Sequence, residues 1–86
     1  MNHRMTQMLE KMENNPQNIH FSDMVKVCDH FFGKPRQHRT SHRIYKTCWV
    51  GDPRINIQNH KGKAKPYQVK QVLAAVKKLE EMNNVR

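Results

Sequence analysis

The segment from Arg39 to Lys46 (RTSHRIYK) places a single histidine, His42, among arginine and lysine side chains. Histidine exchanges protons near neutral pH, and fixed cations beside it can hold a phosphate ester against the imidazole. These are two of the parts that phosphodiester cleavage requires. His42 is therefore the leading candidate for a chemical role.

RNA supplies its own nucleophile, the 2′-OH, so a metal-free nuclease needs proton transfer and stabilisation of the phosphorane charge. We expect His42 to act as a general acid or base, which contributes roughly 10²- to 10⁴-fold in rate when well positioned. Strand alternation places Arg43 on the opposite face and Lys46 on the same face as His42. A second proton-transfer group is needed, and the sequence leaves its identity open among His60, Lys46, Tyr45 and the Ser41 hydroxyl.

The chain shows no pattern typical of a metal or cofactor site. His38 and His42 are four residues apart, which would suit a metal on a helix, but Pro35 and the β-forming residues that follow favour a strand. Cys28 and Cys48 do not form a CxxC pair, so neither a zinc knuckle nor a disulfide framework is expected. At 86 residues the chain is too short for a separate cofactor-binding unit. We expect no cofactor.

The charge distribution favours a polyanionic partner. The formal net charge is +9, and ten basic residues lie between Lys34 and Lys70 against one acid, Asp52. A nucleic acid fits better than a membrane, because no apolar run approaches the roughly 18 residues of a spanning helix. No signal-peptide h-region is present at the N-terminus, so a cytoplasmic location is expected. The residues expected to contact RNA are Arg39, Arg43, Lys46, Lys61, Lys63, Lys65 and Lys70.

Three helices are expected to position these side chains. Apolar residues from Met5 to Met12 recur at helical spacing, and a second helix is predicted from an N-cap at Ser22 to Phe32, with Gly33 at C′. Pro66 is expected to open the last helix, whose core stripe is Val69, Val72, Leu73, Val76 and Leu79. Its N-terminus and the preceding basic loop, 61–65, could clamp a phosphate.

Between the second and third helices the sequence predicts three strands. A polar edge strand is expected over 36–40, and a hairpin over 41–49 and 54–59 around the turn residues 50–53. The returning strand would direct Ile55 and Ile57 inward and its polar residues outward. Trp49 or Tyr45 could stack on bases, although core packing is the expected use of at least one of them. The economical packing is an α+β domain with a three-stranded antiparallel sheet and two helices on one face (α-β-β-β-α), preceded by the N-terminal helix.

This element order is that of the double-stranded-RNA-binding domain, and three motifs narrow the likeness. They are Phe21-Ser22-Asp23-Met24-Val25, Ser41-His42-Arg43-Ile44-Tyr45, and the eleven-residue stretch GKAKPYQVKQV at 62–72. In their order and spacing the chain resembles the HicA family, the mRNA interferases of type II toxin–antitoxin systems. The likeness covers residues 19–79, so 1–18 are expected to be an N-terminal helical extension and 19–86 the HicA-like domain.

The resemblance implies a double-stranded-RNA-binding-domain-like fold and a ribosome-independent endoribonuclease that arrests translation and growth. It also implies mRNA as substrate, a HicB-type antitoxin as partner, and His42 as the catalytic histidine. Family members usually carry Gly-Ser-His where this chain has Thr40-Ser41-His42, and threonine removes some backbone freedom there. The alternative interpretation is a non-catalytic RNA-binding module of the same fold.

Overall fold

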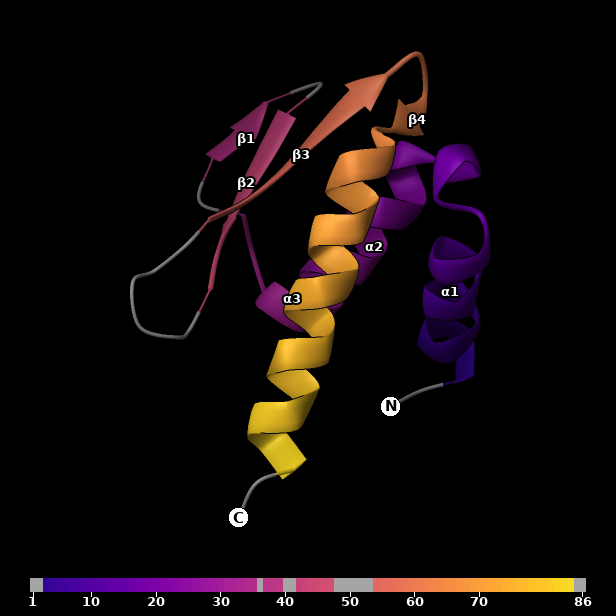
Figure 1. The fold of residues 1–86 in the computed structure, drawn as a ribbon. Helices are drawn as coiled ribbons and strands as arrows, with labels where there is room; N and C mark the ends of the chain where they lie inside the picture. Colours follow the sequence, from indigo (N-terminus) through magenta and orange to yellow (C-terminus); the bar gives the residue numbers. More distant parts are fainter. Residues whose placement is uncertain (1–2, 36, 40–41, 48–53, 85–86) are drawn as a thin grey trace.

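The computed structural model describes residues 3–35, 37–39, 42–47 and 54–84. The elements are, in chain order, α1 (His3–Asn14), a short 3-10 helix η1 (Pro16–Asn18), α2 (Phe21–Phe32), β1 (Gln37–Arg39), β2 (His42–Lys46), β3 (Arg54–His60), β4 (Lys63–Ala64) and α3 (Pro66–Asn84). Figure 1 shows the sheet on one side of the molecule and the helices on the other. The expected α+β class with three helices is confirmed.

The three expected strands form an antiparallel sheet in the order β1-β2-β3, and the two-residue β4 extends it beyond β3. Gln37 pairs with Ile44 across β1 and β2, and Tyr45 pairs with Ile55 across β2 and β3. The fourth strand lies where the sequence predicted only a loop. Of the predicted turn and its flanks, 48–53 lie outside the described residues.

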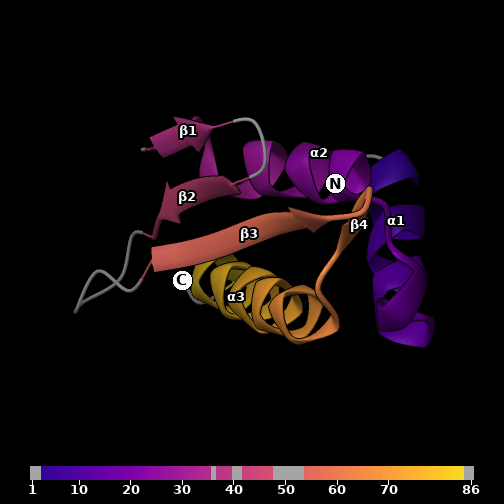
Figure 2. The same cartoon turned by 90° about the horizontal axis from the view of Figure 1, so that it is seen from above.

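Helices α2 and α3 cover the same face of this sheet, as Figures 1 and 2 show from two directions. The sheet contributes Tyr45, Ile55 and Ile57 to the core, and all three are buried. The helices supply apolar stripes at the expected spacing, with Met24, Val27 and Cys28 from α2 and Val69, Val72 and Val76 from α3. The predicted inward orientation of Ile55 and Ile57 is therefore confirmed.

Helix α2 begins two residues earlier than the sequence suggested. Phe21 is already helical and His20 is the N-cap, without a side-chain capping bond. The predicted cap at Ser22 is wrong. Phe21 is buried in the core as part of the first turn, so the helix begins before Ser22. The other end agrees with expectation: Gly33 has φ of 80°, and its N–H donates to the Asp29 carbonyl at 3.2 Å.

Helix α1 belongs to the same core as the rest of the chain. Met12 is fully buried, Met5 nearly so, and both contact the cluster formed by α2, α3 and the sheet. The segment that follows α1 is hydrogen-bonded to the sheet, because the Ala64 N–H of β4 donates to the Ile19 carbonyl at 2.8 Å. The N-terminal helix is thus packed on the domain.

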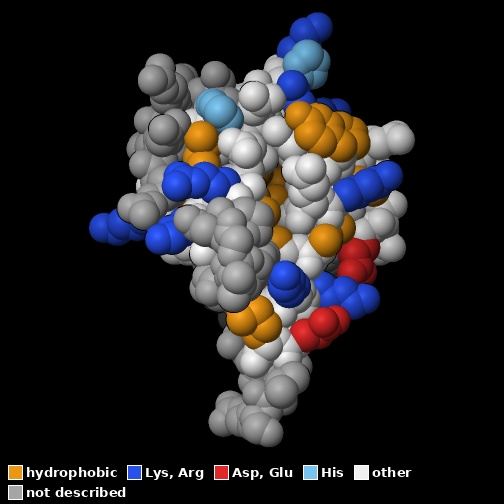
Figure 3. Space-filling view, turned by 60° about the vertical axis from the view of Figure 1, so that its left-hand side comes forward, with side chains coloured by type: hydrophobic (Ala, Val, Ile, Leu, Met, Phe, Trp, Pro, Cys, Tyr) orange, Lys and Arg blue, Asp and Glu red, His pale blue; other side chains and the backbone are white. Residues whose placement is uncertain are grey.

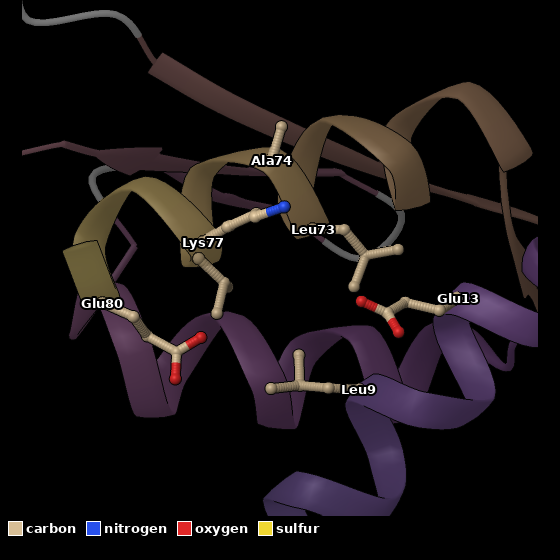
Figure 4. Close-up of a pocket in the computed structure, with 7 residues that line it drawn as sticks. Leu9, Glu13, Leu73, Ala74, Lys77 and Glu80 are labelled. Atoms are coloured by element: carbon tan, nitrogen blue, oxygen red, sulfur yellow. The ribbon is translucent and has the colours of Figure 1, made fainter.

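A groove of about 330 Å³ remains between α1 and α3. Its apolar side chains are Leu9 from α1 and Leu73, Ala74 and Val76 from α3. Figure 4 shows the carboxylates of Glu13 and Glu80 approaching it from opposite ends.

Within the described part of the chain, no helix has the length and hydropathy needed to cross a bilayer.

Candidate functional site

Among the described residues, helices cover one face of the sheet and no helix covers the other, and His42 lies on the second. Tyr45 is buried under the helices, and side chains alternate along a strand, so His42, Ile44 and Lys46 point away from the core. The register adds Arg54, Asn56 and Gln58, which pair with Lys46, Ile44 and His42 in turn. We call these six residues the open face. His42 is half-buried there rather than sealed in the interior.

The register fixes the neighbours of His42. Gln58 of β3 is directly opposite His42, and on the other side the backbone of Arg39 in β1 pairs with it. Lys46 shares the open face as predicted, but it lies four residues farther along β2, about 13 Å at the usual strand rise. His60 follows Gln58 by two residues, at a diagonal position to His42 with Cα atoms about 7–8 Å apart.

Arg43 lies on the helix-covered side of the sheet, as its alternation with His42 predicted. It pairs with Ile57, which is fully buried. Its Nε atom is buried and has no hydrogen-bond partner among the described residues. The structure therefore does not bring Arg43 together with His42 on one face.

Tyr45 is buried in full and its hydroxyl donates to the Asp29 Oδ1 at 2.6 Å. Burial and this hydrogen bond raise the pKa of Tyr45 above its usual value. The ring cannot stack on a base, and the hydroxyl is no longer a candidate for proton transfer at the open face. Trp49 and Ser41, which were also candidates, lie outside the described residues.

Four of the five predicted lysines cluster around the β3–β4 hairpin and the start of α3. The turn residues Lys61 and Gly62 both have positive φ, 53° and 86°, as a two-residue type I′ turn requires. The Asn59 Oδ1 accepts a hydrogen bond from the Gly62 N–H at 2.6 Å and fixes the turn. Lys61, Lys63 and Lys70 are exposed, and Lys65 is half-buried.

Gln68 connects this hairpin region to the open face. It is 3% exposed, and its Oε1 accepts a hydrogen bond from the Gln58 N–H at 2.8 Å. The Gln68 side-chain oxygen thus accepts the backbone N–H that a further strand beside β3 would bind, at the residue opposite His42. This contact was not predicted from the sequence, because a glutamine at the third helical position is expected to bind the N–H of its own N-cap and not that of a strand.

Cationic side chains are spread over the sheet side of the molecule. Figure 3 brings this side forward and shows lysine, arginine and histidine side chains at several places on it, among exposed hydrophobic side chains, with acidic side chains at its lower right. Tyr67, the residue before Gln68, is 55% exposed. The sequence analysis did not single it out, although it stands inside the lysine-rich stretch.

Comparisons with protein-family models, with curated proteins and with solved structures found no significant match.

Proposed function

We propose that this protein is a toxin endoribonuclease of the HicA type, which cleaves mRNA without a metal ion and so arrests translation and growth. The observation that carries the proposal is His42, half-exposed on the open face of the sheet beside a lysine-rich hairpin. The proposal includes a cytoplasmic location and a fold of the double-stranded-RNA-binding-domain type.

Contacts among the three HicA-like stretches support this proposal. The Phe21 N–H of the first stretch donates to the Gly62 carbonyl of the third at 3.0 Å. Gln68 of the third stretch binds β3 opposite His42 of the second. Stretches far apart in sequence therefore meet around one surface, as residues of a shared site would.

In the proposed reaction the imidazole of His42 either removes the 2′-OH proton or protonates the leaving 5′-oxygen. The 2′-oxygen forms a bond to phosphorus as the P–O5′ bond breaks, which leaves a 2′,3′-cyclic phosphate and a 5′-OH end. Nearby cations stabilise the charge on the phosphorane. The lysines of the hairpin and of α3 hold the flanking phosphates, while Arg43 is left out because it lies on the other face.

Among the candidates that the structure describes, His60 is the best placed for the second proton-transfer group. Tyr45 is buried, and Lys46 is about 13 Å along the strand from His42. His60 is exposed, on the same face as Gln58 and one diagonal step from His42.

Replacement of His42 by alanine tests the proposal. We expect His42→Ala to lose RNA cleavage by roughly 10²-fold or more, and to lose growth arrest, at equal protein level. His30→Ala, which removes an exposed imidazole on α2, is the matched control and should behave as wild type. Cleavage should continue in EDTA and leave 5′-OH ends. Undiminished cleavage by His42→Ala would exclude the assignment.

A second candidate function is a non-catalytic RNA-binding module. It is favoured by the exposed lysines of the hairpin and of α3, which can hold phosphates without any help from His42. Salt dependence does not separate the two, because both bind through cations. A gel shift by the wild-type protein without new RNA ends would favour the module.

The proposed partner is a HicB-type antitoxin that covers the open face and His42. A surface this cationic is neutralised best by a complementary acidic one. A small acidic protein encoded by the adjacent reading frame would agree with this expectation.

A further inference from the structure

Tyr67 presents an aromatic ring to solvent at the start of α3. Among the described residues it is the most exposed large hydrophobic side chain, at 55%, ahead of Met82 at 44%. It follows Pro66, the first residue of the helix, so its backbone is held by regular structure. An aromatic ring left uncovered on a rigid element is available to a ligand.

The surroundings of Tyr67 are cationic. Lys63 and Lys65 precede it on β4 and on the connection to α3, and Lys70 follows by three residues, which places it on the same side of the helix. All three belong to the basic stretch that the charge distribution singles out. A ring flanked by ammonium groups suits a nucleotide, which offers a π-face beside a phosphate.

Two hydrogen bonds through Gln68 also connect the Tyr67 hydroxyl to the strand opposite His42. The neighbouring Gln68 donates from Nε2 to the Tyr67 hydroxyl at 3.3 Å and accepts from the Gln58 N–H at 2.8 Å. Gln58 lies opposite His42. The first turn of α3 is therefore bonded, through Gln68, to the strand next to the one that carries His42.

We propose that Tyr67 stacks on one base of the RNA, so that Tyr67, Lys65 and Lys70 form a subsite for an unpaired nucleotide near the bond that His42 acts on. This inference rests on the proposed function and narrows its substrate. Bases in a duplex are already stacked on one another, whereas unpaired bases are free to stack on an aromatic side chain. The substrate class is thus single-stranded RNA or the loops of folded RNA.

The test is a binding experiment in the His42→Ala background, where RNA stays intact. Fluorescence anisotropy measures Kd for a short single-stranded RNA and for a duplex of the same sequence. The variants are Tyr67→Ala and Tyr67→Phe, which keeps the ring but not the hydroxyl. Met82→Ala removes the other exposed large hydrophobic side chain and serves as the control.

We expect Tyr67→Ala to weaken single-strand binding by about 5- to 150-fold, the worth of one base–aromatic stack. Duplex binding should change little, and Tyr67→Phe should stay close to the parent protein. Equal losses for single strand and duplex would overturn the inference, because they would indicate a general electrostatic or structural effect. An unchanged Kd for the single strand would overturn it as well.

Two further outcomes separate this inference from its premise. If the wild-type protein cuts no RNA but Tyr67→Ala still loses single-strand affinity, the nuclease proposal fails and the stacking subsite stands. If Tyr67→Ala binds RNA normally but escapes neutralisation by the antitoxin, Tyr67 belongs to a protein interface and the subsite is refuted.

Discussion

Strand β2 carries the proposed catalytic residue His42 on one face and the core residue Tyr45 on the other. Three residues apart on β2, they point to opposite faces of the sheet, His42 to the open face and Tyr45 into the core. The sequence could predict the alternation, because it follows from strand geometry alone. It could not predict that the Tyr45 hydroxyl would find Asp29, since that contact depends on how α2 packs on β2.

Replacing Tyr45 by phenylalanine should lower the free energy of unfolding by about 1 kcal/mol at neutral pH. The variant removes the hydrogen bond to Asp29 and leaves the ring in place. We expect the modest end of the range for a charged acceptor because Asp29 is exposed and remains hydrated once the bond is lost. Urea unfolding followed by circular dichroism measures the difference; a change below a few tenths of a kcal/mol would contradict it.

Alkaline pH should destabilise the protein through its buried Cys28 and Tyr45. Burial raises the pKa of Cys28 from 9.0 to about 12, and the pKa of Tyr45 is raised from 10.0. The unfolded chain then binds fewer protons than the folded one, so stability is complete below pH 9 and falls as the pH rises toward 12. Tyr45→Phe should flatten the part of this fall above pH 10.

The β3–β4 hairpin shows which elements the sequence did and did not predict. The helices were predicted because apolar residues recur at helical spacing over several turns. The hairpin was missed because its second strand has only two residues and its turn is Lys-Gly, not the Asn-Gly or Asp-Gly that signals a type I′ turn. The pairing of His42 with Gln58 also could not be predicted, because register depends on the conformation of the connection between the strands.

Substitution of Gly62 should show that the hairpin depends on its turn. Gly62→Ala places a Cβ at a φ of 86°, which we expect to cost about 1–2 kcal/mol of stability. The cost is conformational, because nothing lies within 4 Å of the added atom. Lys61→Asn is the matched variant and should stabilise slightly, since asparagine tolerates the left-handed region better than lysine. Thermal melts of both variants would decide; equal melting temperatures would contradict the turn assignment.

At the scale of the whole molecule, α1 shares one hydrophobic core with the rest of the protein. The sequence had predicted a boundary at residue 18, between an N-terminal extension and the domain. Met12 is fully buried against the remainder of the protein. The sequence indicated an amphipathic helix but not its depth of burial, because methionine stripes suit either a core or a partner surface. The N-terminal helix thus contributes to the stability of the domain.

Met12→Ala should destabilise the entire protein by about 2–5 kcal/mol, as for other large-to-small changes in a packed core. Met8→Ala, on the same helix but only half-buried, should cost clearly less. A single cooperative transition at lower denaturant concentration would agree with one shared core. Loss of α1 helicity without a shift of the main transition would instead show that α1 docks independently.

The placement of charge over the fold has a kinetic consequence. Four of the described carboxylates, those of Glu10, Glu13, Glu80 and Glu81, lie on α1 and the second half of α3, whereas the described residues of the sheet and its hairpin include lysines and arginines but no acid. The molecule is therefore an electric dipole with its positive pole at the sheet. As it diffuses toward a polyanion, the field exerts a torque that turns the sheet forward, so a larger share of collisions arrives in a productive orientation. Added salt shortens the range of that torque and with it the encounter rate.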